Sequence, residues 1–379
     1  MENKKFFFAV ATLVSTIIGA GIFALPYAFA RAGFWPSLLI FGILAAVSII
    51  IMLMYGEVML RTEGIQHEST GYAGIYLGKV GRVFMLAINL LGVYGGLLIY
   101  IIGGGDFLRA VFGPETSLSP LIWGIVFFGV VACFVIMGMH FVSKADLAFS
   151  ILFVVLVTVI FVLAAPKISV ANFSTGDFSQ ILFPFGVIIF SLSGSAAIAL
   201  INNILKGQAR SLKSAIVWGG VIAAVINLVF TVAVLGLGGA GVAPDSVETV
   251  RQFLPPFASL ALAIFGLLAV GTSFFIFGLI MRNMYMFDFK IRRGWAVLLT
   301  LIFPIVFFCL GVNNFVSTIS FVGSITGGLT GIMYVLMYRR ARVTGKRPPE
   351  YSINFPVWVQ GIVLFMYVLA IAYEIVQLF

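Results

Sequence analysis

Two glycines interrupt the first long apolar segment of this 379-residue chain, in the run Gly19-Ala20-Gly21. Glycine inside a helix costs about 1 kcal/mol relative to alanine. In hydrocarbon, each backbone N–H or C=O group that lacks a partner costs several kcal/mol more. A helix weakened at this place therefore offers main-chain N–H and C=O groups to a polar ligand. The chemistry that this spacing predicts is binding by the backbone.

A second cluster of small and polar residues lies in a later apolar segment, in the run Ser191-Leu192-Ser193-Gly194-Ser195. Taken alone, such a cluster is also typical of close packing between helices. If the chain is built from inverted repeats, however, this segment is the counterpart of the first one, five helices later. Interruptions at corresponding positions of two repeats are typical of the ligand site of secondary transporters. We therefore predict that the two breaks form one site at mid-membrane.

The elements that must position these breaks are membrane helices. The chain is 62% hydrophobic and 9% charged, with a mean hydropathy of +1.17, whereas soluble domains are about a quarter charged. The expected fold class is an all-α polytopic membrane protein without a soluble domain. Since a crossing needs about 20 apolar residues, we expect about 11 transmembrane helices. Their predicted ranges are 6–30, 35–60, 80–110, 119–140, 145–165, 181–205, 212–239, 257–281, 294–311, 314–338 and 354–378.

The basic residues predict the orientation of these helices. With the N-terminus in the cytoplasm, 18 of the 22 Lys and Arg residues fall on the cytoplasmic side, and this asymmetry follows the positive-inside rule. The four on the external side are Arg31, Arg109, Lys167 and Arg251. Eleven helices then place the C-terminus outside. The net charge of +9 thus indicates an integral protein of the cell membrane with the lipid bilayer as its partner, and no nucleic-acid partner is expected.

The first break carries a family likeness. The run Gly-Ala-Gly-Ile-Phe-Ala-Leu-Pro at 19–26, continued by Tyr27-Ala28-Phe29-Ala30-Arg31-Ala32-Gly33, resembles the first helix of transporters in the amino acid–polyamine–organocation superfamily. The resemblance is closest to the amino acid/auxin permeases and the bacterial aromatic amino-acid permeases. It implies the LeuT-like fold with helices 1 and 6 broken at mid-membrane. Two inverted five-helix repeats would then occupy residues 1–165 and 181–338, and an additional helix residues 354–378.

The resemblance also implies an amino-acid substrate held between the breaks and moved by alternating access. The N–H groups at the start of the outer half of helix 1 would bind its carboxylate, helped by the helix dipole. Carbonyl groups at both breaks would accept from its ammonium group. The predicted substrate-binding residues are Ile17, Gly19, Ala20, Gly21, Ile22, Phe190, Ser191, Ser193, Gly194 and Ser195.

The central parts of helices 3, 6, 8 and 10 carry no evident charge, which favours a neutral, apolar or aromatic side chain on the substrate. Candidate neighbours of that side chain are Asn89, Tyr94, Ser195 and Phe274. Catalytic residues and an organic cofactor are not expected, so the chain is not predicted to be an enzyme. A membrane amino-acid sensor and a passive pore remain alternative functions.

A coupling ion is implied by the run Ala269-Val270-Gly271-Thr272-Ser273, which is similar to the sodium-site pattern of LeuT-fold carriers. By this resemblance the Na⁺ ligands would be the carbonyls of Ser15, Ile18 and Ala269 and the hydroxyls of Thr272 and Ser273. Oxygen ligands suit a small hard cation. Alternatively, the hydroxyls only bond back to the preceding helical turn. Proton-driven relatives often place a lysine of helix 5 near this site, and helix 5 here has none, so sodium symport is favoured over proton coupling.

Three further features carry expectations. Glu57, near the inner end of helix 2, is expected to form an ion pair with Arg61 one turn later rather than to carry protons. The external segment 242–256 is either a helical lid or a connecting loop. Cys133 and Cys309 are expected to be ordinary buried residues of their spans.

Glycines away from the two breaks are assigned structural roles. Gly323, Gly327 and Gly331 repeat every four residues, which predicts one packing face of helix 10. The run 103–105 consists of three glycines and is expected to mark the outer end of helix 3.

Overall fold

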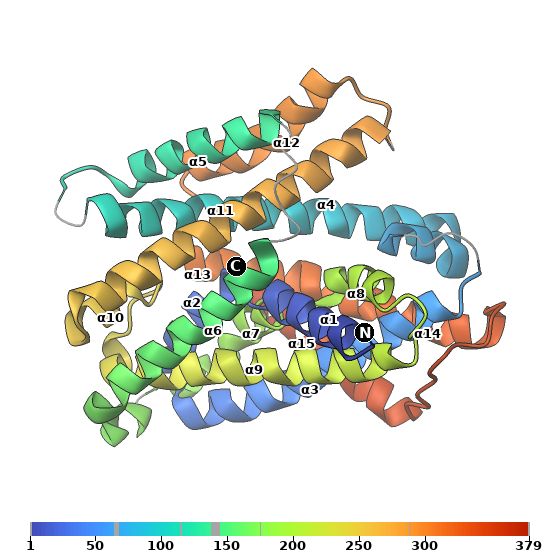
Figure 1. Cartoon of the computed structure of the whole chain (residues 1–379), viewed down its shortest axis with the longest axis horizontal. Coiled ribbons are helices and arrows are strands. Elements are labelled where there is room, and N and C mark those ends of the chain that lie inside the picture. Colours follow the sequence, from blue (N-terminus) through green and yellow to red (C-terminus); the bar gives the residue numbers. More distant parts are fainter. Residues whose placement is uncertain are drawn as a thin grey trace.

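The computed structural model describes residues 2–63, 68–113, 116–137, 145–174, 176–287 and 289–377, and all regular secondary structure within these ranges is helical. The predicted fold class is therefore confirmed. Long helices run side by side along the molecule (Figure 1). The breaks lie inside this bundle, on helices that appear early and midway in the chain.

In chain order, the helices are α1 Glu2–Ile17, α2 Gly21–Ala32, α3 Phe34–Leu60, α4 Ser69–Phe112, α5 Pro120–Met137, α6 Ala145–Ala164, η1 Ala165–Lys167, η2 Val170–Ser174, η3 Phe178–Gln180, α7 Pro184–Ser191, η4 Ser195–Ala197, α8 Ile198–Ile204, α9 Ser211–Gly238, η5 Gly239–Gly241, α10 Val247–Phe253, α11 Pro256–Phe287, α12 Arg293–Cys309, α13 Phe315–Phe321, η6 Val322–Gly327, α14 Gly328–Thr344 and α15 Val357–Gln377.

Several of these helices, alone or as continuous pairs, are long enough to cross a membrane. In the described part of the chain, eight helices or continuous helix pairs are sufficiently long and apolar, and the bent pair formed by α1 and α2 counts as a ninth. Two shorter apolar helices, Ile151–Lys167 and Arg293–Cys309, follow the same pattern. Each predicted range overlaps one of these elements, while the total of eleven crossings stays a prediction.

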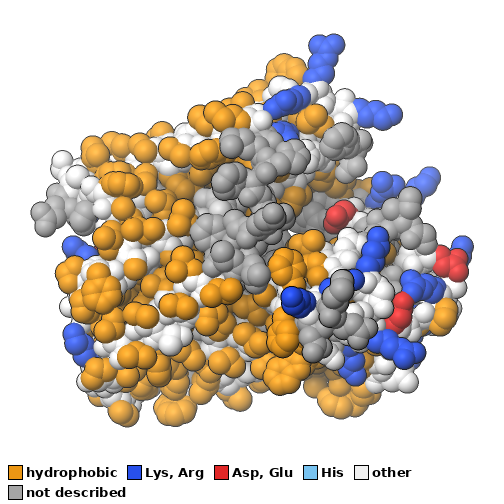
Figure 2. Space-filling model, in the orientation of Figure 1, with side chains coloured by type: hydrophobic (Ala, Val, Ile, Leu, Met, Phe, Trp, Pro, Cys, Tyr) orange, Lys and Arg blue, Asp and Glu red, His pale blue; other side chains and the backbone are white. Residues whose placement is uncertain are grey.

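The surface matches a lipid-facing bundle. Hydrophobic side chains cover most of the visible face, and Lys and Arg gather mainly at one end of the molecule (Figure 2). Cys133 and Cys309 are both exposed on this surface, so the expectation that they are buried was wrong. An apolar residue of a membrane span can face lipid as well as protein, and composition alone does not separate the two cases. His67 and His140 stand alone in the sequence near predicted span ends, where surface or capping roles are expected for them, and both lie outside the described residues.

Helix α4 differs from its prediction at both ends. It begins at Ser69 instead of residue 80, with a kink at Gly78, whose φ of 75° breaks the helical path. Tyr72, Ala73 and Tyr76 are buried, so the added turns pack by one apolar face. The triple glycine at 103–105 lies inside α4 and not at its end. A Cβ on Gly105 would lie 2.7 Å from the backbone nitrogen of Gly124 in α5, so these glycines permit close helix packing.

Helix 10 is not one regular helix. Between α13 and α14, residues Val322–Gly327 form the π-helix η6. A Cβ on Gly323 would lie 2.9 Å from the carbonyl carbon of Gly186 in α7, and one on Gly331 would lie 2.6 Å from the ring of Tyr367 in α15. The glycines serve close packing, as predicted, but they pack against two different helices because the π-turn shifts the register.

Two connections are folded against the bundle. Residues 242–256 contain the short helix α10, and Ser246 donates a 2.5 Å hydrogen bond to the carbonyl of Phe23 in α2. On the opposite side, Glu57 pairs with Arg61 at 2.7 Å and accepts from the backbone N–H of Ile353 at 2.9 Å. The predicted ion pair is confirmed, and it also holds the connection between α14 and α15.

Candidate functional site

The first break separates α1 from α2. The two helices meet at a bend of 55°, and the residues between Ile17 and Gly21 leave the helical path. The N–H of Ile18 still bonds the carbonyl of Val14 at 2.9 Å, which closes the end of α1. The first N–H groups of a helix have no partner within that helix. Gly21 and Ile22 therefore present donors where α2 begins.

The second break follows α7. That helix ends at Ser191, and regular structure resumes only at Ser195. The N–H of Ser193 bonds the carbonyl of Phe190 at 3.2 Å, and the hydroxyl of Ser191 donates to Val187 at 2.7 Å. The Ser191 hydroxyl thus serves its own helix. The N–H of Leu192 also points to the Phe190 carbonyl, so this oxygen accepts from two backbone donors of the break.

The two breaks contact each other directly. A Cβ on Gly21 would lie 2.8 Å from the Cα of Ser191, closer than real Cβ contacts. In the other direction, a Cβ on Gly194 would lie 2.6 Å from the side chain of Ile17. Each break thus places a glycine against the other break. The fold brings together residues that are about 170 positions apart in the chain.

Polar side chains from α14 and α4 lie beside the second break. The hydroxyl of Tyr334 lies near the hydroxyls of Ser195 and Ser69, and its ring stacks on Tyr55 at 4.2 Å. Asn89 donates to Ser69 at 3.0 Å. Of these residues, Ser195 and Asn89 were predicted from the sequence as parts of the site. Tyr334, Tyr55 and Ser69 were not. Tyr334 could have been found from the sequence, because it places a hydroxyl group in the apolar helix 10. Ser69 could not, because it falls outside the predicted membrane spans.

Tyr94 and Phe274, two of the residues expected to contact the substrate side chain, make their contacts away from the two breaks. Tyr94 lies 2.5 Å from the hydroxyl of Tyr285 and donates to the carbonyl of Leu299 in α12. Phe274 packs against Phe127 and Phe128 of α5. Both side chains therefore belong to the interface of α4, α5, α11 and α12, away from the breaks.

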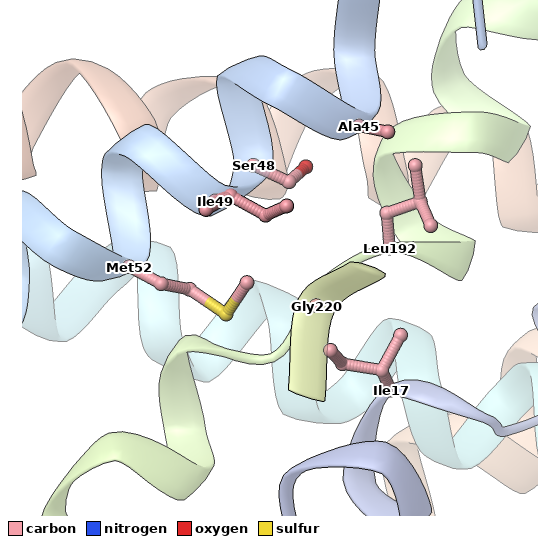
Figure 3. A pocket seen from close by; sticks show the side chains of 7 residues that line it. All are labelled: Ile17, Ala45, Ser48, Ile49, Met52, Leu192 and Gly220. Atoms are coloured by element: carbon pink, nitrogen blue, oxygen red, sulfur yellow. The ribbon is translucent and has the colours of Figure 1, made fainter. Parts of the chain in front are cut away.

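A small hollow adjoins both breaks on the side of α3 and α9 (Figure 3). It contains about 170 Å³ of space and is lined by Ile17, Ala45, Ser48, Ile49, Met52, Leu192 and Gly220. The space is too narrow to admit a water molecule, whereas ligand pockets usually measure about 300–1,000 Å³. This hollow is therefore not a substrate cavity, and the side chains of Ile17 and Leu192 are closely packed beside the two breaks.

The residues of the predicted sodium set lie on two separate helices. Ser15 lies in the last turn of α1, and Ile18 directly follows this helix, which packs mainly on α9, α6 and α8. Ala269, Thr272 and Ser273 belong to α11, whose main partners are α4, α12 and α10. Thr272 donates to the carbonyls of Leu268 and Ala269 at 2.9 and 3.0 Å, and the hydroxyl of Ser273 lies near that of Tyr100. Among the described residues, α1 and α11 are not among each other's main packing partners.

Comparison with known proteins supports a transporter. The tryptophan/tyrosine permease family matches residues 2–375. The chain is 23% identical over 334 residues to glutamine transporter 2 of Aliivibrio fischeri, covering 85% of this chain and 86% of that protein. It is 26% identical over 232 residues to tyrosine-specific transport system 1 of Haemophilus influenzae, covering 59% of this chain and 56% of the relative.

A solved structure gives the fold. The crystal structure of MhsT in complex with L-phenylalanine matches with a TM-score of 0.68 at 16% identity, over 97% of this chain and 98% of MhsT. MhsT has the LeuT fold, so the paired breaks of this chain occupy a LeuT-type bundle. With a family match that spans nearly the whole chain, this protein belongs to the tryptophan/tyrosine permease family, and it is an integral membrane amino-acid transporter and not an enzyme.

Proposed function

We propose that this protein is a secondary active transporter that carries a neutral L-amino acid with an apolar or aromatic side chain together with Na⁺. The observation that carries this proposal is the direct contact between the breaks at Gly21 and Ser191. No Asp, Glu, Lys or Arg occurs between residues 15 and 25 or between 184 and 200. A substrate bound there must bring both of its own charges, as a zwitterionic amino acid does.

Main-chain groups of the two breaks would hold that zwitterion. The N–H groups of Gly21 and Ile22 would donate to the substrate carboxylate at the positive end of the α2 dipole. Carbonyls of Ile17 and Phe190 would accept from the ammonium group. The backbone at Gly19, Ala20, Ser193 and Gly194 completes the surface between the helices. A hydrophobic side chain on the substrate is supported by the names of the family and of the tyrosine-specific relatives.

The proposed sodium site forms when α1 approaches α11. The Thr272 hydroxyl donates its hydrogen to its own helix, but its oxygen keeps lone pairs that a cation can use. Bonding back to the helix and binding a cation are therefore compatible. Together with Ser273, Ala269 and the carbonyls of Ser15 and Ile18, this oxygen would draw α1 onto α11. Sodium would then stabilise the conformation in which the inner half of helix 1 is closed.

Thermal unfolding of the purified protein with each of the twenty amino acids, with and without Na⁺, tests this proposal. A ligand at about 100 times its dissociation constant stabilises the folded state by about 2.7 kcal/mol. We expect apolar or aromatic amino acids to raise the unfolding temperature, and Na⁺ to increase this shift. Thr272→Ala should remove the Na⁺ effect and retain part of the amino-acid effect. Concentrative uptake in sodium-free buffer, driven by a pH gradient alone, would contradict sodium coupling and favour a proton.

A further inference from the structure

A buried carboxyl group lies near the end of α15, outside the substrate and sodium sites. Glu374 is 8% exposed, and its side chain accepts a 2.7 Å hydrogen bond from the hydroxyl of Ser320. Among the described residues, no Lys or Arg forms an ion pair with it. Glu57, the other buried glutamate, is paired with Arg61. Since burial disfavours the charged form of a carboxyl group, a buried acid without a counter-ion needs an explanation.

The partner of Glu374 belongs to an unusual turn of helix 10. Ser320 lies two residues before the π-helix η6, and π-turns inside helices frequently occur at functional sites. A Cβ on Gly186 of α7 would lie 2.7 Å from the Ser320 hydroxyl oxygen. A Cβ on Gly323 would lie 3.0 Å from the Cβ of Phe190. The segment that Glu374 holds is therefore in van der Waals contact with the backbone of α7.

Helix α7 continues this contact to the substrate site. It runs from Gly186 to its end at Ser191 in less than two turns, and Ser191 touches Gly21 of the first break. Glu374, Ser320 and Gly186 thus form one continuous series of contacts with the two breaks. A change in the hydrogen bond between α15 and α13 would act on the same helix that carries half of the substrate site.

Few charged groups surround Glu374. Helices α7, α13 and η6 contain no Asp, Glu, Lys or Arg. The basic residues of α14 lie toward its opposite end, where Arg339 bonds Gln360. The titratable neighbour on α15 itself is Tyr373. A proton is the ligand that such a carboxyl group can bind without a further charged partner.

We propose that Glu374 is a proton-binding site that links pH to the position of α7 and hence to substrate binding. In the ionised state, the Ser320 O–H donates to the carboxylate. A proton from the aqueous phase converts one carboxyl oxygen into an O–H donor, the group becomes neutral, and the Ser320 hydroxyl is released from donating to a charge. The hold of α15 on α13 and η6 then weakens. The inference rests on the proposed function only because α7 forms part of the substrate site.

The substrate dissociation constant, measured by thermal shift at constant Na⁺ between pH 5 and pH 8, tests the link for wild type and for Glu374→Gln. Linkage to one proton changes this constant by up to about tenfold per pH unit. We expect the wild-type dependence to be lost in Glu374→Gln, which cannot titrate. Asp177→Asn is the matched control, because hydrogen bonds from Ser179 lower the pKa of exposed Asp177 and it stays ionised throughout this range. Equal pH dependence in wild type and Glu374→Gln would overturn the proposal.

Infrared difference spectra recorded across the same pH range, without substrate, test proton binding separately from transport. We expect a carboxylic-acid C=O band that grows as the pH falls in wild type and Asp177→Asn, and that is smaller in Glu374→Gln by the contribution of one carboxyl group. Asp106 and Asp245 are further acids that are not fully exposed, so the comparison is between wild type and the variant. A band of unchanged size in Glu374→Gln would show that the proton binds elsewhere. Because this measurement needs no amino acid, it distinguishes a failure of the proton site from a failure of the proposed substrate or of sodium coupling.

Discussion

The two halves of the first membrane helix are held in very different ways. Most residues of α2 are buried, from Gly21 to Ala32, and Phe23 packs against Phe107 and Phe230. The half formed by α1 exposes Phe7 and Phe8 and also Thr16 near the break. The outer half is thus part of the core, whereas the inner half lies at its edge and leans mainly on α9.

This difference explains how one half of a broken helix can stay in place while the other half moves. Buried elements open only at a free energy close to that of global unfolding, whereas elements with few buried contacts move at lower cost. We infer that α2 keeps its position while α1 moves relative to α11. The sodium set, divided between α1 and α11, is the natural place for an ion to bias that motion.

The largest expected effect is on stability, and it concerns the buried Glu57–Arg61 ion pair at the inner end of α3. Glu57→Leu removes the acceptor for Arg61, Ser352 and the Ile353 N–H. Breaking a buried ion pair by removing one partner costs about 3–5 kcal/mol. We expect a lower unfolding temperature, measured by calorimetry, whereas the exposed Glu63→Leu control should unfold like wild type. If Glu57→Gln retained stability but lost the pH dependence of transport, Glu57 and not Glu374 would be the proton site.

The next largest effect is on amino-acid affinity. Two glycines of the first break, one in contact with the second break and one not, test whether this contact matters. Gly21→Ala places a Cβ against Ser191, whereas Gly19→Ala meets nothing within 4 Å. Overpacking costs about 1–3 kcal/mol, and a coupling of that size weakens binding about 5- to 150-fold. We expect weaker amino-acid binding in Gly21→Ala and a smaller change in Gly19→Ala, measured by isothermal titration calorimetry. Equal affinities in the two variants would mean that the break is only a packing feature.

A smaller effect is expected on hydrogen exchange when the side-chain hydrogen bonds that hold α1 and α2 are removed one at a time. Ser246 bonds the Phe23 carbonyl in a buried position at 2.5 Å, and Lys5 bonds the Lys206 carbonyl in an exposed position at 3.2 Å. Ser246→Gly removes the hydroxyl and suits the φ of 63° at this position. Loss of a hydrogen bond costs about 0.5–1.5 kcal/mol, so we expect faster hydrogen exchange in α2. Lys5→Met should leave exchange in α1 almost unchanged, and a reversed order would contradict the comparison.

Much of the architecture follows from local patterns. The apolar ranges coincide with helices, and both breaks lie where glycine and serine interrupt them. The Glu57–Arg61 pair also follows from spacing, because residues four apart face each other on a helix. Other features did not follow: Gly103, Gly104 and Gly105 suggested a helix end, yet they lie within α4 against α5 and α13. Glycine weakens a helix and also permits close packing, and its neighbours in space decide which effect wins.

Composition and spacing by themselves determined that this chain is a helical membrane protein, where its apolar segments lie and where two of them are interrupted. These are properties of short stretches of chain, because burial in lipid and the cost of free backbone groups act on each segment separately. Only the tertiary structure decided that Gly21 and not Gly19 meets Ser191, that Tyr334 lies near Ser195, and that Glu374 accepts a hydrogen bond from Ser320. Such contacts depend on how each helix is rotated and crossed against its neighbours, and that geometry is set by packing of the whole bundle.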